Sequence, residues 1–176
     1  MKTKRLLMIA FAVTITFVQE QMFLILPQVQ LTIVLMFVFA SILTYKESFM
    51  YITVYVILDN LYLGGFNPLN AIPMFIMWNT IPYIYNIVLR RTEDEAKIAK
   101  AAFVFGFLYS WSFIPGAILL YGFGNVWQYY ILADIPWEIA LAVVGYVSVL
   151  WAYKPLVNIV KQLDQQTTLS RQKAYE

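Results

Sequence analysis

The chain has 176 residues, of which 61% are apolar and 12% are charged, and its formal net charge is +2. Soluble domains are about half apolar and about a quarter charged, so this composition predicts an integral membrane protein. The absence of Cys and His excludes disulfides and thiolate metal sites, and it removes the commonest general acid–base side chain. The small net charge gives no reason to expect nucleic acid as a partner.

The first apolar segment follows a basic N-terminus. Three basic residues precede an apolar run over residues 6–18, as in a secretory signal peptide. A small-residue cleavage site does not follow this run, because Gln19, Glu20 and Gln21 come next. We therefore expect an uncleaved first transmembrane helix within residues 1–24, with its basic end in the cytoplasm.

Five further apolar segments predict five more transmembrane helices. The second and third are a little shorter than the roughly 20 residues that a perpendicular crossing needs. The fifth helix is expected to bend, if anywhere, at Pro115 and Gly116, and the sixth continues past Pro155 toward a short tail that starts near residue 164. The expected spans are residues 31–44, 49–63, 70–89, 101–121 and 134–151.

All twelve Lys and Arg residues fall on one side of this six-helix arrangement. Cytoplasmic segments of membrane proteins carry the excess of Lys and Arg, so both termini and the charged loop over residues 90–100 are expected inside. Residues 25–30, residues 64–70 and the aromatic segment 122–133 then form outer loops. The sequence predicts one all-α membrane domain over residues 1–176, with six transmembrane helices and both termini cytoplasmic.

The junction between the third and fourth spans, residues 59–70, is the clearest candidate for a site. Two Gly and one Pro break the helical pattern there, which indicates a turn. Asp59, Asn60, Asn67 and Asn70 lie in this junction, and polar groups at membrane depth are costly unless they face protein, a partner or water. Two interpretations stay open, a small-molecule pocket and a solvated outer loop.

Four carboxylates, those of Glu20, Asp59, Asp134 and Glu138, lie in the outer half without a basic residue nearby. They favour a cationic or hydroxyl-rich ligand, although protonated carboxyls would serve as well. Asp134 has a second explanation, because it stands where it would cap the sixth helix ahead of a proline.

Most of the aromatic side chains are expected in the interfacial belts or the core. Four are candidates for stacking on a planar ligand, because polar or proline irregularities accompany them. These four are Trp78, which precedes Asn79, and Tyr83, Trp111 and Trp127.

Small residues recur at helical spacing in two spans. Ala10 and Thr14, with Ala12 and Thr16, form such ladders in the first span, and Ala102, Gly106 and Ser110 form one in the fifth. Small residues let two helices approach closely, either in a partner or within the chain. The sequence contains no phosphate-binding loop, catalytic carboxylate pair or metal-spaced cluster.

Three short segments resemble the substrate-binding S components of energy-coupling factor vitamin transporters, in particular the cobalamin-type branch. Residues 26–30 read Leu-Pro-Gln-Val-Gln, where that branch has Leu-Pro-Asn-Val-Gln, so Gln28 replaces an Asn. Residues 60–64 read Asn-Leu-Tyr-Leu-Gly, which is similar to its Asn-aromatic-aromatic-Leu-Gly. The run over residues 131–137 resembles the start of the family's sixth helix.

This resemblance implies a non-enzymatic vitamin-binding subunit in a bacterial plasma membrane, with no cofactor, metal or ATP site of its own. The implied partners are a transmembrane coupling subunit and two ATPase subunits. Ala10, Ala12, Thr14 and Thr16 would replace the family's Ala-xxx-Ala docking motif. The residues expected to bind substrate are Gln28, Gln30, Asp59, Asn60, Asn67, Asn70, Trp78, Asn79, Trp127 and Asp134, with Asn125 close by.

Two other classes of function remain open from the sequence. One is a small multi-span scaffold of the cell-envelope machinery, which would need no buried polar cluster. The other is a membrane enzyme acting on lipid. Ligand binding without turnover would separate a binding subunit from both.

Overall fold

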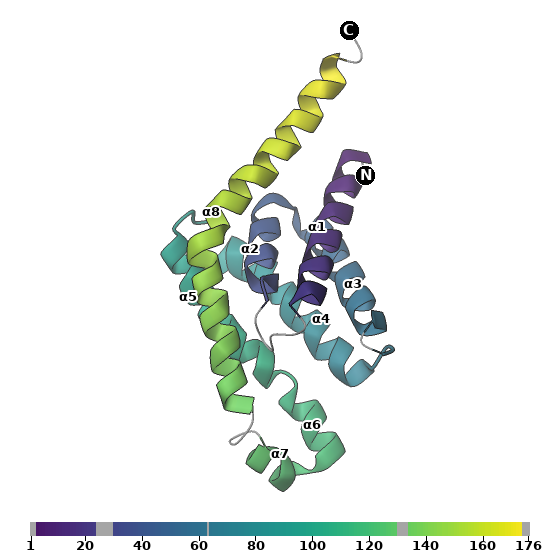
Figure 1. Ribbon diagram of the computed structural model, residues 1–176, viewed down its shortest axis with the longest axis vertical. Coiled ribbons are helices and arrows are strands. Elements are labelled where there is room, and N and C mark those ends of the chain that lie inside the picture. The colour runs from purple at the N-terminus through teal and green to yellow at the C-terminus, as the bar shows by residue number, and fades with distance from the viewer. Residues whose placement is uncertain (1–2, 24–29, 63, 130–133, 174–176) are drawn as a thin grey trace.

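The computed structural model describes residues 3–23, 30–62, 64–129 and 134–173, with side chains up to residue 164. Within these ranges every regular element is a helix, which confirms the all-α fold class (Figure 1). The helices are α1 (Thr3–Met22), α2 (Thr32–Ile42), α3 (Tyr45–Tyr62), α4 (Pro68–Tyr83), the π-helix η1 (Ile84–Val88), α5 (Glu95–Trp111), α6 (Ile114–Tyr121), α7 (Phe123–Tyr129) and α8 (Ile135–Lys173).

Three helical stretches of the described chain are long and apolar enough to cross a membrane. They are Thr3–Met22, Glu95–Tyr121 and Ile135–Asp164. The 11 residues of α2 are fewer than the roughly 20 that a perpendicular crossing needs, and α4 passes directly into the π-helix η1. The structure therefore supports a membrane protein, and the expectation of six spans stays a prediction.

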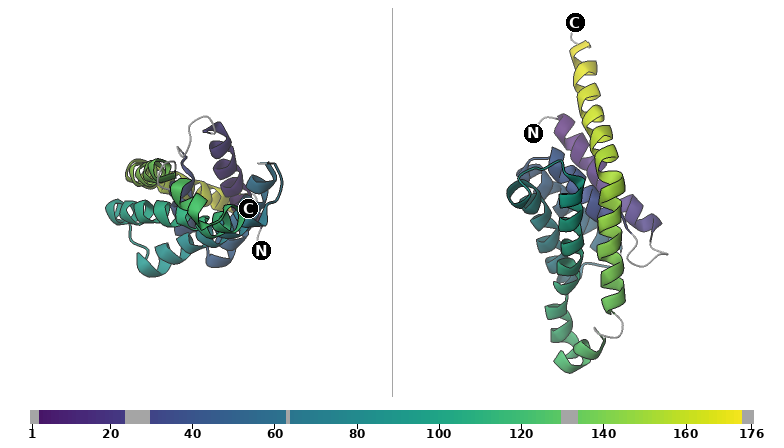
Figure 2. Two further views of the ribbon diagram at one scale, coloured as in Figure 1. Left: turned by 90° about the horizontal axis from the view of Figure 1, so that it is seen from below. Right: turned by 90° about the vertical axis from the view of Figure 1, so that its left-hand side faces the viewer.

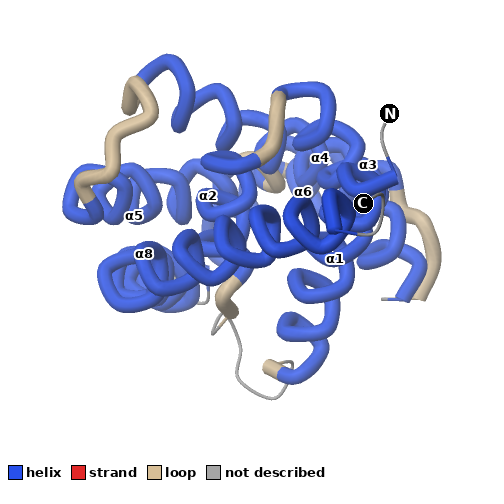
Figure 3. The backbone as a smooth tube through the Cα atoms, turned by 90° about the horizontal axis from the view of Figure 1, so that it is seen from above, coloured by secondary structure: helices blue, strands red, loops and turns tan. Residues whose placement is uncertain are grey.

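The core is organised around α2. Every residue of this helix from Thr32 to Ala40 is buried, and a helix that is apolar all round needs neighbours on all sides. α2 lies in the middle of the bundle, in contact with α1, α3, α4, α5 and α8 (Figure 3). The central position of α2 thus explains why this short helix has no polar face.

α5 and α8 run antiparallel and side by side, and they form the most extensive helix pair (Figure 2). Their closest approach is at Gly106, where an added Cβ would lie 2.8 Å from the Cα of Ala142. Ala102 and Gly106 of the small-residue ladder of α5 therefore pack within the chain, since Ala102 is fully buried as well.

Two local expectations were wrong. α5 ends at Trp111, four residues before Pro115, because the proline has no N–H for the Trp111 carbonyl; the helix therefore breaks earlier than expected. The expected outer loop 122–133 contains the helix α7 over Phe123–Tyr129.

One end of the molecule, which we call the basic end, is held by ion pairs between helices. Lys4 and Arg5 at the start of α1 and Lys154 and Lys161 in α8 contribute the cations. The pairs are Lys4–Asp164 (3.1 Å), Arg5–Glu47 (3.4 Å), Lys154–Glu95 (3.3 Å) and Lys161–Glu93 (3.5 Å). They bring the starts of α1, α3 and α5 and the later part of α8 to the same end.

Candidate functional site

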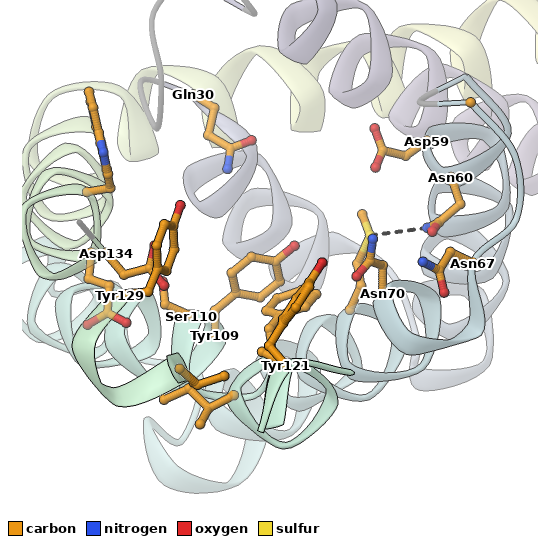
Figure 4. Close-up of a pocket in the computed structure, with 18 of the residues that line it drawn as sticks. Gln30, Asp59, Asn60, Asn67, Asn70, Tyr109, Ser110, Tyr121, Tyr129 and Asp134 are labelled. Carbon is orange, nitrogen blue, oxygen red and sulfur yellow. Dashed lines mark hydrogen bonds between the residues drawn. The ribbon is translucent and has the colours of Figure 1, made fainter. Parts of the chain in front are cut away.

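A cavity of about 1140 Å³ opens at the other end, which we call the cavity end (Figure 4). It receives side chains from α1 and α3 to α8, so it depends on the packing of the whole bundle. Its polar lining consists of Glu20, Gln30, Asp59, Asn60, Asn67, Asn70, Ser110, Asn125, Asp134 and Glu138. The larger apolar and aromatic side chains in its wall include Met74, Tyr109, Phe113, Tyr121, Tyr129 and Trp137.

The structure brings most of the expected site residues to this cavity. They come from separate parts of the chain, namely the segment before α2, the α3–α4 junction and the residue before α8. Those that line the cavity are Gln30, Asp59, Asn60, Asn67, Asn70 and Asp134. Gln28 lies outside the described residues. The remaining three, Trp78, Asn79 and Trp127, lie elsewhere.

Trp78 is 1% exposed and belongs to the core rather than to the cavity wall. Its ring packs on those of Tyr109, with centroids 4.8 Å apart, and Phe105, at 5.3 Å. Since Tyr109 lines the cavity, Trp78 supports the wall from behind. Asn79 donates its amide to the Phe75 carbonyl one turn earlier in α4, at 2.8 Å.

Trp127 lines a separate apolar hollow of about 380 Å³ beside α6 and α7. Trp111, Ile118 and Phe123 form other parts of its wall. The aromatic segment after α6 is thus divided, because Tyr129 faces the main cavity while Trp127 faces this hollow.

The turn between α3 and α4 positions three asparagines. Gly64 and Gly65 have φ of +110° and +120°, a backbone conformation that side chains with a Cβ rarely adopt. The N–H of Gly65 donates to the Asn60 carbonyl at 3.3 Å, which closes the end of α3. Asn67 then caps α4, its side-chain oxygen accepting from the Leu69 N–H at 3.0 Å.

The buried amide of Asn60 is held in place from two sides. It donates to the Val56 carbonyl at 2.9 Å and contacts the Met74 sulfur at 3.5 Å (Figure 4). Asn70, in the first turn of α4, is exposed toward the cavity. The turn therefore fixes its own geometry through Asn60 and Asn67 and leaves the Asn70 amide for a ligand.

Polar residues at the end of α1 divide into two groups. Gln19 is buried and structural, because it donates to Thr32 (2.8 Å) and accepts from the Leu31 N–H (2.9 Å), which ties α1 to the start of α2. Glu20 faces the cavity, and its carboxylate accepts a hydrogen bond from the Tyr55 hydroxyl.

Asp134 and Glu138 lie at the start of α8. Asp134 directly precedes the helix, in the position expected of a cap, and its partial burial raises the pKa of its carboxyl above the usual value. Glu138 is 5% exposed and accepts a hydrogen bond from the Trp111 indole at 3.2 Å.

Several lining residues were absent from the expected binding set. Glu20 and Glu138 were weighed only as outer carboxylates, and Ser110 only as part of a packing ladder. Tyr109, Tyr121, Tyr129 and Trp137 carried no signal that separated them from interfacial aromatics. Only their common position at the cavity end distinguishes them.

The two ladders of α1 face in different directions. Ala12 and Thr16 are fully buried, and Thr16 shares a 2.6 Å hydrogen bond with the Tyr51 hydroxyl. Ala10 and Thr14 are exposed. Ala10 and Thr14 are therefore accessible to a docking partner, whereas Ala12 and Thr16 are not.

The described residues hold no group of three or more carboxylates placed for a metal ion. The cavity offers amide groups, carboxylates and aromatic rings, which together suit recognition of a small polar molecule with a ring. No protein-family model, curated protein or solved structure matches the chain.

Proposed function

We propose that the chain is the substrate-binding subunit of an energy-coupling factor type importer in a bacterial plasma membrane. It captures a vitamin or a related micronutrient outside and delivers it inward when an ATP-driven module acts on it. The observation that carries the proposal is a cavity of about 1140 Å³ whose wall converges from seven helices, with polar groups from distant parts of the chain. A pocket of this size holds a drug-sized molecule.

The charge distribution supports an outward-facing cavity. The cations of the ion pairs between helices lie at the basic end, while no Lys or Arg of the described residues lines the cavity. Under the positive-inside rule the basic end is cytoplasmic and the cavity end is external. Both termini are then cytoplasmic, as in a six-span arrangement.

The proposed partners are a transmembrane coupling subunit and two ATPase subunits. Ala10 and Thr14 offer a place for the coupling subunit, because they are small, exposed and one helical turn apart on α1. Neighbouring Leu7 and Phe11 are also exposed, so the same face is apolar and fits a transmembrane helix.

Native mass spectrometry of the full chain, purified from cells grown on rich medium, tests the binding function. We expect a non-lipid small molecule of several hundred daltons to be retained, and uptake of that molecule to depend on the chain. A chain that retains no such molecule and takes up none would contradict the proposal and favour a scaffold.

Single-cysteine labelling tests the orientation independently, because the chain has no native Cys. Phe66 in the exposed α3–α4 turn and Lys97 in α5 are matched positions at the two ends. An impermeant reagent added outside should label Phe66→Cys and leave Lys97→Cys unlabelled. Labelling of the Cys at position 66 from the cytoplasmic side alone would reverse the arrangement.

A further inference from the structure

Two carboxylates enter the cavity from the ends of helices that already carry negative potential. Glu20 lies in the last turn of α1 and Asp59 in the last turn of α3, and neither turn contains a basic residue. The carbonyl end of a helix has a partial negative charge, which favours cations and disfavours carboxylates. Both carboxylates therefore stand where an acidic side chain is least favourable unless a cation is present.

Asp59 has no compensating contact in the described part of the chain. Its residue is 4% exposed, it takes part in no hydrogen bond or ion pair there, and its carboxylate is turned into the cavity (Figure 4). Glu20, by contrast, accepts a hydrogen bond from Tyr55. Because the cavity is open, water can reach the Asp59 carboxylate, and a ligand that displaces this water has to supply a charge or hydrogen bonds in its place.

The chain supplies no positive side chain to this site. No Lys or Arg lines the cavity, and the sequence has no His. The segments 24–29 and 130–133 contain no basic residue either. A positive group for this carboxylate can therefore come from the molecule that enters.

A metal ion fits this site poorly, because the described residues hold no group of three or more carboxylates placed for one. Aromatic rings are the second feature of the wall, with Tyr109, Tyr121, Tyr129 and Trp137 all lining it. Such rings attract organic cations through their faces and stack on planar heterocycles.

Two amide side chains lie near Asp59 in the cavity wall (Figure 4). Asn67 and Asn70 lie at the N-terminus of α4, on the same side of the cavity as Asp59 (Figure 4), and the partially positive helix end there favours acceptor groups of a ligand. This part of the wall therefore offers a carboxylate for a positive group and amides for neutral polar groups of the same molecule.

We propose that the molecule bound in this cavity is an organic cation with a ring, whose positively charged nitrogen pairs with Asp59 beside Glu20. The Asn70 amide, on the same side of the cavity (Figure 4), is available to its neutral, hydrogen-bonding groups. This assignment rests on the proposed binding function and adds the chemical class of the substrate.

Three indole compounds of similar size test the charge preference. Tryptamine is a cation at neutral pH, tryptophol is uncharged and indole-3-acetate is an anion. Isothermal titration of the purified full chain should show tryptamine binding roughly tenfold to a hundredfold more tightly than tryptophol, since a hydrogen bond to a charged group is worth about that factor. Indole-3-acetate should bind weakest.

Asp59→Asn should remove most of the preference for tryptamine and leave the affinity for tryptophol nearly unchanged. Retained tryptophol binding shows that this variant is folded. Glu93→Gln makes the same chemical change on an exposed carboxylate at the basic end, and it should keep the preference.

The results distinguish failure of the cation assignment from failure of the proposed binding function. Equal or tighter binding of tryptophol or indole-3-acetate, or a tryptamine preference that survives Asp59→Asn, overturns the cation assignment and leaves the binding function intact. If no probe binds, the molecule retained in native mass spectrometry decides: a cation lost in Asp59→Asn supports the assignment, and an uncharged or anionic molecule overturns it. A chain that binds no probe and retains no molecule refutes the binding function itself.

Discussion

The two ends of this bundle use acidic side chains in opposite ways. At the basic end, Glu47 is 7% exposed and is paired with Arg5 while also accepting hydrogen bonds from Thr44. At the cavity end, Asp59 is 4% exposed and has no such partner in the described chain. Burial alone is therefore uninformative about role, and the proposed site rests on a carboxylate that combines low exposure, the lack of a partner and a position in the cavity wall.

The largest expected effect is on delivery rather than on binding. Replacing Ala10 and Thr14 together by Leu should abolish uptake of the cognate molecule, because bulky side chains keep a docked helix away. The amount retained in native mass spectrometry should stay at the parent level.

Val18→Leu, on an exposed part of α1 nearer the cavity end, is the matched control and should leave uptake unchanged. Equal loss of retention and uptake in the Ala10/Thr14 variant would mean that this part of α1 serves the fold or the cavity.

The Arg5–Glu47 ion pair at the basic end should contribute substantially to the free energy of unfolding. Arg5→Met leaves the Glu47 carboxylate buried without its cation, which should lower the free energy of unfolding by roughly 2–3 kcal/mol, near or below the usual cost of breaking a buried pair. Solvent reaches a third of Arg5, which keeps the value low. Thermal unfolding in detergent measures it.

Two variants test whether the loss of stability in Arg5→Met comes from the unpaired charge of Glu47. Lys97→Met removes the cation of an exposed pair with Asp94 and should change stability by less than about 0.5 kcal/mol. Glu47→Gln added to Arg5→Met should recover part of the loss. If the double variant is as unstable as the sum of the single ones, the charge explanation fails.

In the cavity, Asn70→Ala should weaken retention of the cognate molecule by about 1–3 kcal/mol, or roughly fivefold to a hundredfold, through loss of a buried hydrogen bond to the ligand. Asn79→Ala is the matched control, because this amide bonds to the Phe75 carbonyl within α4 and does not line the cavity. Equal affinity of the two variants would place the ligand away from the α3–α4 turn.

The smallest expected effect has the opposite sign from that of Arg5→Met. Asp59→Asn should raise the thermal stability of the ligand-free chain, by about 1 kcal/mol, because it removes a buried charge that lacks a partner. A clear loss of stability would show that Asp59 has a structural partner and that the contrast between the two ends is false.

The sequence predicted the cavity as a region better than as a set of residues. The polar turn at Asp59, Asn60, Asn67 and Asn70 was visible because polar groups interrupt two apolar runs, and these side chains do reach the cavity. Trp78 and Asn79 follow within three helical turns, yet they point to the core and along α4. Their direction depends on how α4 is rotated against α5, which no local pattern specifies.

By itself, the sequence determined the helical elements and the separation of charge, because apolar runs, prolines and glycines act locally and basic residues mark one side. Tertiary structure alone decided which face of each helix packs in the core and which face stays exposed. Ala10 with Thr14 and Ala12 with Thr16 are equivalent ladders in the sequence, but they lie on different faces of α1. Packing against α2 and α3 buries the second ladder and leaves the first exposed, because a helix can present only one face to the core.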